Sequence, residues 1–183
     1  MVILASASPR RQELLRMICS EFSVIPANIE ETVEENLSIY DYPEYLAVKK
    51  AGHIHKSHYD DVVIGSDTGV FIDDVMLGKP ENHEDAVNML RKLSGRTHKV
   101  ITGCAICYKD KTVSFSQITE VEFYSLSDRE IEEYVSTGEP MDKAGAYGIQ
   151  GKGATLVKGI KGDFYNVIGL PVALLKRKLA EIE

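Results

Sequence analysis

An aspartate and a threonine that follow a short apolar run are the first candidates for chemistry in this sequence. Residues 62–64 are Val-Val-Ile, a pattern typical of a strand buried on both faces, and Gly-Ser-Asp-Thr follows at 65–68. Asp67 is therefore predicted at the carboxyl end of a buried strand, the edge of an open α/β sheet at which ligands bind. A carboxylate there can act as a general base or as a metal ligand, and the sequence leaves both roles open.

A lysine is predicted to return to the same place. The apolar runs 70–72 and 75–77 flank two aspartates, which predicts a hairpin with a two-residue turn. Counting outward from that turn places Lys79 opposite Thr68, one residue from Asp67. The alternative is a surface hairpin with a chance ion pair.

Two arginines stand in the first turn of a predicted helix. Ser8 suits the N-cap, and Pro9 suits the first helical position. A helix N-terminus carries partial positive charge, so Arg10 and Arg11 are unfavourable there unless an anion binds. Together with the backbone N–H groups they indicate a phosphate site. Replacing either arginine by alanine is then expected to impair substrate use without lowering thermal stability. The alternative is that both are solvated or pair with Glu13 and other acids.

A lysine and an acidic run add further candidates. Lys50 falls near the middle of the apolar face of a predicted helix at 43–54, where it either extends to solvent or meets a buried anion. The run Asn28–Asn36, which includes Glu31, is typical of a solvated loop but can also supply a carboxylate to a metal. Gln150 stands in the glycine-rich segment 138–153, and such glycines commonly let a backbone approach a ligand.

The elements that must position these residues are those of an α/β protein with a mixed sheet. Strands are expected at 2–5, 22–26, 62–64, 70–72, 75–77, 99–108, 112–124 and 154–160. Helices are expected from Pro9, at 43–54 and 82–93, from a capping box at Ser127 to residue 138, and at 171–182, with a loop at 162–169. Strands and helices alternate around hairpins, which predicts a mixed twisted sheet with flanking helices in a single domain, residues 1–183.

Composition excludes several classes of partner. The hydrophobic content of 44% suits a globular protein, and the net charge of −7 argues against a nucleic-acid polymer or an anionic membrane as partner. No apolar run is long enough to span a bilayer, and the start of the chain lacks a basic leader, so a cytoplasmic location is expected. Cys104 and Cys107 have an odd spacing within a predicted strand, so they are expected to be structural rather than a redox or zinc pair.

Taken together, these stretches resemble the Maf family of nucleoside triphosphate pyrophosphatases. The motifs that carry the resemblance are Leu4–Arg11, Lys50-Ala51, Asp67-Thr68, Gly78–Pro80, Leu93–His98, Gly138–Gly151 and Gly169–Pro171. The resemblance implies hydrolysis of a nucleotide between its α- and β-phosphates, which yields the monophosphate and pyrophosphate. It also implies a divalent cation (Mg²⁺ or Mn²⁺), a homodimer, and an inosine triphosphatase-like fold with two lobes around a central cleft.

The resemblance assigns roles by matching motif. Asp67 looks like the proton acceptor that activates water, and Glu31 and Asp67 look like metal ligands. The residues that look like substrate binders are Ser6, Arg10, Arg11, Lys50, Thr68, Lys79 and Gln150. Three of them, Arg10, Thr68 and Gln150, match the positions that set base preference.

The segment Gly148–Gly151 is similar to the subfamily acting on dTTP and UTP, rather than the one acting on 7-methyl-GTP. The Gln150 amide can donate to a pyrimidine carbonyl and accept from N3–H, which CTP lacks. The chain departs from the family pattern at Ser66, where alanine is usual, and at Gly69, where a β-branched residue is common. Alternative functions are a pyrophosphatase for modified nucleotides and a non-enzymatic regulator of septum formation in cell division.

Overall fold

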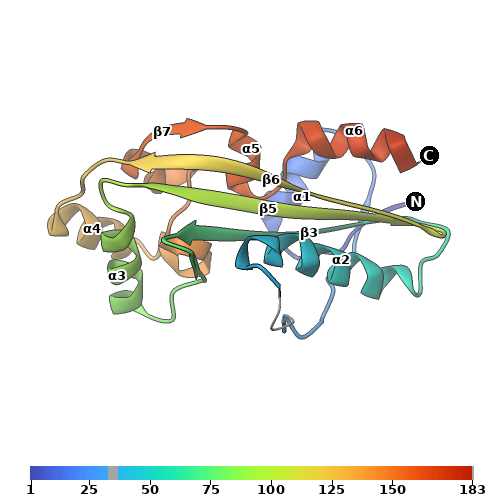
Figure 1. Cartoon of the computed structure of the whole chain (residues 1–183), viewed down its shortest axis with the longest axis horizontal. Helices are drawn as coiled ribbons and strands as arrows, with labels where there is room; N and C mark the ends of the chain where they lie inside the picture. Colours follow the sequence, from blue (N-terminus) through green and yellow to red (C-terminus); the bar gives the residue numbers. More distant parts are fainter. Residues whose placement is uncertain (33–36, 183) are drawn as a thin grey trace. The chain divides into compact units, whose positions relative to one another are not determined.

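A computed structural model describes residues 1–32 and 37–182 (Figure 1). Its strands are β1 (Val2–Leu4), β2 (Ser23–Val24), β3 (Val62–Ile72), β4 (Val75–Leu77), β5 (Thr97–Tyr108), β6 (Lys111–Phe123) and β7 (Val157–Lys161). Its α-helices are α1 (Pro9–Arg16), α2 (Tyr42–His55), α3 (His83–Leu93), α4 (Asp128–Val135), α5 (Phe164–Ile168) and α6 (Val172–Ile182). Four 3₁₀ helices are η1 (Ile39–Asp41), η2 (Glu139–Asp142), η3 (Ala144–Ala146) and η4 (Gly151–Leu156).

The strands of the described chain form one mixed sheet. Its hydrogen-bonded order is β2-β1-β3-β5-β6-β7, and β4 pairs with β3. β1 runs parallel to β2 and β3, whereas β4 runs antiparallel to β3 and β7 antiparallel to β6. The predicted α/β class with a mixed sheet and flanking helices is confirmed.

The chain divides into two compact units, each with its own buried apolar cluster. The first unit comprises Met1–Thr68, Thr102–Gln117 and Gly169–Glu183, and the second comprises Gly69–Ile101 and Ile118–Ile168. The first cluster includes Ile3, Ala47, Ala51, Val63 and Ala105. The second includes Val70, Leu90, Val121, Phe123, Ile131 and Tyr147, and α3 and α4 lie side by side within this unit (Figure 1).

In the first unit, helix α2 packs on the sheet with almost no space between backbones. A Cβ at Gly65 of β3 would lie 2.2 Å from the carbonyl oxygen of Ala47, and one at Gly103 of β5 would lie 2.2 Å from the backbone nitrogen of Glu44. Because neither residue has a side chain, α2 lies directly on two neighbouring strands. Figure 1 shows the helix beside β3.

Strand β3 is continuous through the segment in which the sequence suggested an end. It runs for 11 residues, and Asp67 lies near its centre rather than at its carboxyl end, which corrects the prediction. The parallel ladder with β1 covers Val62–Ile64, and the antiparallel ladder with β4 covers Val70–Ile72. These ladders, together with the pairing of β3 with β5, hold the glycine-containing segment extended, and Asp67 lies on β3 between the ladders with β1 and β4.

The predicted hairpin register is confirmed where β3 and β4 pair. The ladder runs from Ile72–Val75 to Val70–Leu77 and stops there. Lys79 is exposed two residues beyond the end of β4. Its predicted pairing with Thr68 is therefore not part of this ladder.

Two predictions near the C-terminus were wrong. The segment from Ala154 begins as 3₁₀ helix η4, and strand β7 starts only at Val157. The expected loop 162–169 contains helix α5, because the Asp163 carboxylate accepts hydrogen bonds from the backbone N–H groups of Tyr165 and Asn166, at 2.8 and 3.4 Å. The capping box at Ser127 is present as predicted.

Candidate active site

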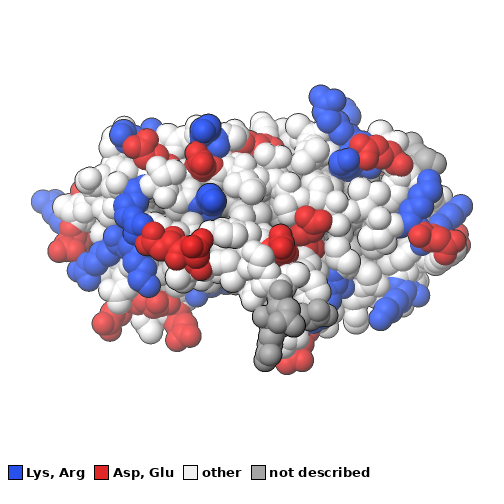
Figure 2. Space-filling view, in the orientation of Figure 1, with Lys and Arg blue, Asp and Glu red and all other residues white. Residues whose placement is uncertain are grey.

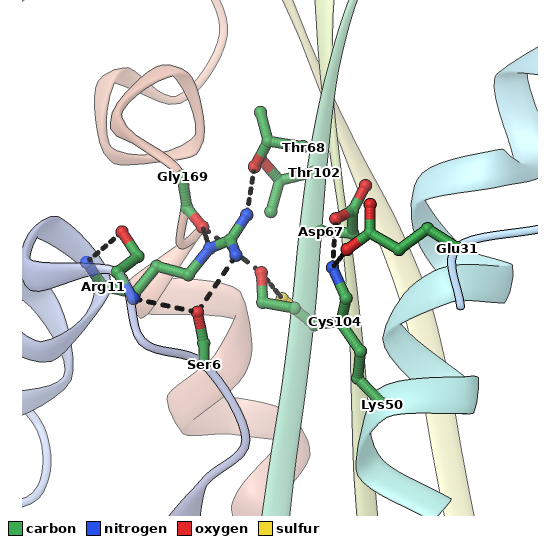
Figure 3. A network of polar contacts seen from close by, with 11 residues as sticks. Ser6, Arg11, Glu31, Lys50, Asp67, Thr68, Thr102, Cys104 and Gly169 are labelled. Carbon is green, nitrogen blue, oxygen red and sulfur yellow. Dashed lines mark hydrogen bonds and ion pairs between the residues drawn. The ribbon is translucent and has the colours of Figure 1, made fainter. Parts of the chain in front are cut away.

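Two carboxylates converge on one buried lysine (Figure 3). The Lys50 Nζ lies 2.7 Å from Oδ1 of Asp67 and 2.7 Å from Oε1 of Glu31. The Lys50 side chain is 11% exposed, so its charge has lost most of its water and needs opposite charge nearby. Lys50 thus meets anions, as one of the two interpretations expected, but these are the partly exposed Asp67 and the exposed Glu31 of the acidic run rather than a buried group.

The backbone of β3 explains why Asp67 meets Lys50. Side chains alternate along a strand, so Gly65 and Asp67 belong to the same face. The contact of Gly65 with α2 shows that this face is the one covered by the helix. Close packing at Gly65 therefore brings the Lys50 ammonium within reach of the Asp67 carboxylate.

A second lysine on α2 fixes the loop that carries Glu31. The Lys49 Nζ donates to the carbonyl oxygens of Glu30 and Thr32, at 2.8 and 3.2 Å, and to Oγ1 of Thr32 at 3.3 Å. The backbone is thus held on both sides of Glu31. Sequence reasoning missed Lys49 because a lysine directed away from the apolar face of a helix has no distinguishing pattern. Of the same acidic run, Glu34 and Glu35 lie outside the described residues.

The second group of polar side chains lies on the other side of β3 (Figure 3). Arg11 donates from Nε to the carbonyl oxygen of Gly169 (3.0 Å), from Nη1 to Oγ of Ser6 (3.2 Å), and from Nη2 to Oγ1 of Thr68 (3.0 Å). Burial lowers the pKa of Arg11, and the charge of Asp67 opposes that shift. Neither alternative reading of Arg11, as solvated or as paired with Glu13, describes this arrangement, since its partners are three neutral oxygens.

Buried hydroxyls and a thiol support this second group. Oγ1 of Thr68 lies 2.9 Å from Oγ1 of Thr102, and Oγ of Ser66 donates to the Gly169 carbonyl at 3.2 Å. Cys104 Sγ donates to Oγ of Ser66 at 3.7 Å, and burial raises the Cys104 pKa to about 12, so the thiol stays protonated. Sequence reasoning missed Thr102, although it did predict a structural role for Cys104.

The remaining predicted residues are placed as follows. Ser8 is the N-cap of α1 as predicted, since its hydroxyl accepts from the backbone N–H of Arg11. Arg10 is half-buried, and its charge, after burial, also lowers the Arg11 pKa. Lys79 and Gln150 are exposed residues of the second unit, and Gln150 is the N-cap of η4. The structure thus brings together Ser6, Arg11 and Thr68 as one group and Glu31, Lys50 and Asp67 as another.

The donor set of Glu31 and Asp67 fits a divalent cation of the Mg²⁺ type. Carboxylate oxygens are the ligands that such hard cations prefer, and Mg²⁺ is commonly bound by one or two carboxylates together with substrate phosphates. Among the described residues, no group of three or more His, Cys, Asp or Glu side chains could hold a metal. A cation at this pair would therefore need the substrate to complete its ligands.

The fold has known counterparts. The Ham1 protein of Staphylococcus aureus matches with a TM-score of 0.57 at 18% identity, over 100% of this chain and 99% of that one. A HAM1 protein from Coxiella burnetii matches with a TM-score of 0.54, also at 18% identity, over 98% of each chain. At this identity the likeness establishes the class of fold alone, a Ham1-like α/β protein.

The family follows from the sequence comparison. The model of the Maf-like protein family matches residues 1–182, and the chain belongs to the Maf family. A dTTP/UTP pyrophosphatase of Bacillus velezensis is 53% identical over 180 residues, covering 98% of this chain and 95% of that protein. A dTTP/UTP pyrophosphatase of Bacillus mycoides is 48% identical over 182 residues, covering 100% and 95%.

Proposed function

We propose that this protein hydrolyses dTTP and UTP to their monophosphates and pyrophosphate. The observation that carries the proposal is the near-full-length identity of 48–53% to proteins named dTTP/UTP pyrophosphatase. The site supplies chemistry suited to that reaction, because the partly exposed carboxylate of Asp67, on β3, lies beside the buried ammonium of Lys50, on α2. This combination can hold a water molecule and stabilise negative charge on phosphate oxygens.

Asp67 is the residue that activates water in this proposal. Its carboxylate orients a water molecule and takes its proton as the water oxygen bonds to the α-phosphorus. The bridging P–O bond breaks, and pyrophosphate leaves with that electron pair. Lys50 holds Asp67 at 2.7 Å in the resting site and offers its charge to the phosphate oxygens when substrate is bound.

We also propose a divalent cation held by Glu31 and Asp67. When bound, such a cation would neutralise charge on the phosphate oxygens and favour their attack by water. Lys49 keeps Glu31 in reach of that position by fixing the backbone at Glu30 and Thr32. The homodimer implied by the family resemblance stays a prediction.

Phosphate binding is proposed for the start of α1 and for Lys79. Ser6 and Arg10 lie at or beside the N-terminus of α1, where backbone N–H groups favour an anion. Arg11 uses three of its five N–H donors in hydrogen bonds to Gly169, Ser6 and Thr68. It therefore also holds these three segments of the site in place.

Gln150 is proposed to read the base, with Thr68 and Arg10 contributing to base preference. The Gln150 amide offers one donor group and one acceptor, as uracil and thymine require. Gln150→Leu should reduce the preference for dTTP over CTP, because it removes the amide that distinguishes the hydrogen-bonding edge of thymine from that of cytosine.

The charge on the surface and the length of the helices are the features relevant to nucleic acids and membranes as partners. Nucleic-acid binders usually present a basic stripe or patch. The face in Figure 2 instead presents Lys and Arg side chains among Asp and Glu side chains. Within the described residues, no helix is both long and apolar enough to cross a bilayer.

A panel of nucleotides tests the proposal. The wild-type protein is incubated with each canonical ribo- and deoxyribonucleoside triphosphate and Mg²⁺ or Mn²⁺, and pyrophosphate and monophosphate are quantified. The proposal expects kcat/KM for dTTP and UTP well above that for CTP. Comparable rates on all nucleotides would contradict the substrate assignment, and the absence of pyrophosphate would contradict the reaction.

A further inference from the structure

The carboxylate of Glu139, in η2, binds the far end of the segment that carries Gln150. Its Oε2 accepts the backbone N–H of Lys152 at 3.0 Å, and its Oε1 accepts that of Gly153 at 3.0 Å. The same Oε1 also accepts the hydroxyl proton of Tyr134, from α4, at 3.0 Å. One carboxylate therefore satisfies two successive backbone donors and fixes Tyr134.

Tyr134 binds the near end of the same segment. Its hydroxyl oxygen accepts the backbone N–H of Gly148 at 3.2 Å. The two ends also touch, because a Cβ at Gly153 would lie 2.1 Å from the carbonyl oxygen of Gly148. Residues 148–153 are thus a closed loop whose ends are both held by the Tyr134–Glu139 pair, and Gln150 lies in its exposed middle.

The glycine that follows Gln150 is shaped by the same carboxylate. Gly151 has φ of +70°, and a Cβ there would lie 2.9 Å from Oε2 of Glu139. The Lys143 side chain lies against Gly148 in the same way, since a Cβ added at Gly148 would lie 2.7 Å from Cε of Lys143. At these two glycines the position that a Cβ would take is next to side-chain atoms of Glu139 and Lys143.

Glu139 is held in its ionised form. Partial burial disfavours its charge, but hydrogen bonds from the N–H groups of Gly153 and Lys152 and from Tyr134, with the charge of Lys143, outweigh burial and lower its pKa. An ionised carboxylate is an acceptor only, so it matches the two backbone donors. A glutamine at this position would turn an N–H₂ group toward one of them.

We infer that Glu139 and Tyr134 are positioning residues for base selectivity, acting through Gln150. The inference rests on the proposed function, in which Gln150 reads the base. An exposed glutamine on a mobile loop could present its amide either way round and would discriminate poorly. A loop closed at both ends presents that amide from one fixed backbone, and preorganisation of this kind is what selectivity from a single side chain requires.

The test uses Glu139→Gln and Tyr134→Phe, which keep side-chain size and remove the acceptor or the hydroxyl. Glu133→Gln is the matched control, because Glu133 lies on α4 with an exposed side chain that forms an ion pair with the exposed Arg129. Each variant is assayed for kcat/KM on dTTP and on CTP, alone and with Gln150→Leu. Amide hydrogen exchange at Gly148, Lys152 and Gly153 is followed by NMR without nucleotide.

Glu139→Gln is expected to lower the dTTP-to-CTP ratio of kcat/KM by about tenfold or more, because small misplacements of a binding group are costly. With Gln150→Leu already present, the same substitution should change the ratio less than about twofold, since effects transmitted through one residue are not additive. Exchange at Lys152 and Gly153 should become faster in Glu139→Gln, and exchange at Gly148 in Tyr134→Phe. Glu133→Gln should change neither the ratio nor the exchange.

Two results would overturn the inference. Unchanged exchange in Glu139→Gln and Tyr134→Phe would show that the pair does not hold the loop, whatever nucleotide the enzyme prefers. Faster exchange with an unchanged dTTP-to-CTP ratio would leave the pair a purely structural role. A wild type that shows no preference for dTTP would contradict the proposed base reading instead, and the exchange result would then decide alone whether the loop is held.

Discussion

Arg11, predicted to bind an anion, instead forms hydrogen bonds with the protein's own oxygen atoms. Its guanidinium binds one carbonyl and two hydroxyl oxygens, contributed by the segments at Ser6, Thr68 and Gly169. These acceptors lie in three separate parts of the first unit, so the arginine ties them together. Ser66 adds a hydrogen bond to the same Gly169 carbonyl, which gives a use to a residue that departs from the family pattern.

Arg11→Ala is therefore expected to destabilise the protein, contrary to the expectation from the helix dipole. The substitution removes three hydrogen bonds from a charged donor, at a cost of about 2–4 kcal/mol. Glu13→Ala, at an exposed position of the same helix, keeps those bonds and should cost much less. Urea denaturation of both variants and the wild type measures the difference, and equal stabilities for the two variants would contradict this account of Arg11.

At this scale, sequence reasoning found the residues with distinctive chemistry and missed their partners. Lys50 stood out because a charge on an apolar helix face needs an explanation, and the explanation proved to be two carboxylates. The neutral partners of Arg11 were not predictable, because Thr68 and Gly169 are 57 and 158 residues away in the chain. Lys49 and Thr102 have no local pattern that marks them.

At the scale of elements, the contact between α2 and β3 determines the geometry of Asp67 and Lys50. Gly65→Ala places a methyl group 2.2 Å from the Ala47 carbonyl oxygen, so helix and strand must separate. We expect a loss of about 1–3 kcal/mol or more from overpacking. Activity should fall by about tenfold or more, because Lys50 moves away from Asp67.

Gly52→Ala on the same helix is the matched control. A Cβ at Gly52 meets nothing within 4 Å, so the substitution should leave activity unchanged and raise stability by about 0.4–1 kcal/mol. Thermal unfolding and dTTP hydrolysis are measured for both variants. If Gly65→Ala behaved like Gly52→Ala, close packing of α2 on β3 would not be what positions the pair.

Most elements were predictable, and the exceptions have physical causes. Helix starts with clear caps, at Ser8, Asn82 and Ser127, were located correctly. Strand β3 was not predicted as one element, because its glycines suggest a break and it is pairing with β1, β4 and β5 that keeps it extended. The 3₁₀ helices between Glu139 and Leu156 depend on tertiary hydrogen bonds such as those of Glu139, which no local pattern reveals.

At the scale of the whole molecule, a buried histidine makes stability depend on pH. His98 is 2% exposed, stacks edge-to-face with Phe123 and Tyr147, and lies with Nε2 2.7 Å from the Tyr147 hydroxyl oxygen. Burial lowers the His98 pKa from 6.5 to about 4. The folded state therefore holds the neutral imidazole, whereas the unfolded chain takes up a proton below about pH 6.5.

The direction in which stability changes with pH follows from this difference in proton uptake. The unfolded state binds more protons between about pH 6.5 and 4, so stability is complete above that window and falls by about 2–4 kcal/mol as the pH decreases through it. The check is chemical denaturation at a series of pH values for the wild type and His98→Gln, which cannot titrate. The wild type should lose more stability than the variant across this window, and parallel curves would rule out His98 as the cause.

The sheet order and the division into two units are also properties of the whole chain. Sequence patterns gave the class of fold, but the order β2-β1-β3-β5-β6-β7 depends on pairings between distant strands. Similarity to Ham1 proteins at 18% identity shows that this class of fold tolerates extensive change of sequence. The reaction must therefore be argued from side chains such as Asp67 rather than from the fold.

The most direct test of the central claim is the rate of dTTP hydrolysis by Asp67→Asn, measured beside the wild type and the exposed control Asp60→Asn. Products are separated by chromatography, and circular dichroism confirms that each variant is folded. The account predicts dTMP and pyrophosphate from the wild type and from Asp60→Asn, and a fall in kcat of at least about a hundredfold for Asp67→Asn, because the base is lost. A folded Asp67→Asn that keeps its turnover, or a wild type that releases dTDP and inorganic phosphate, would contradict it.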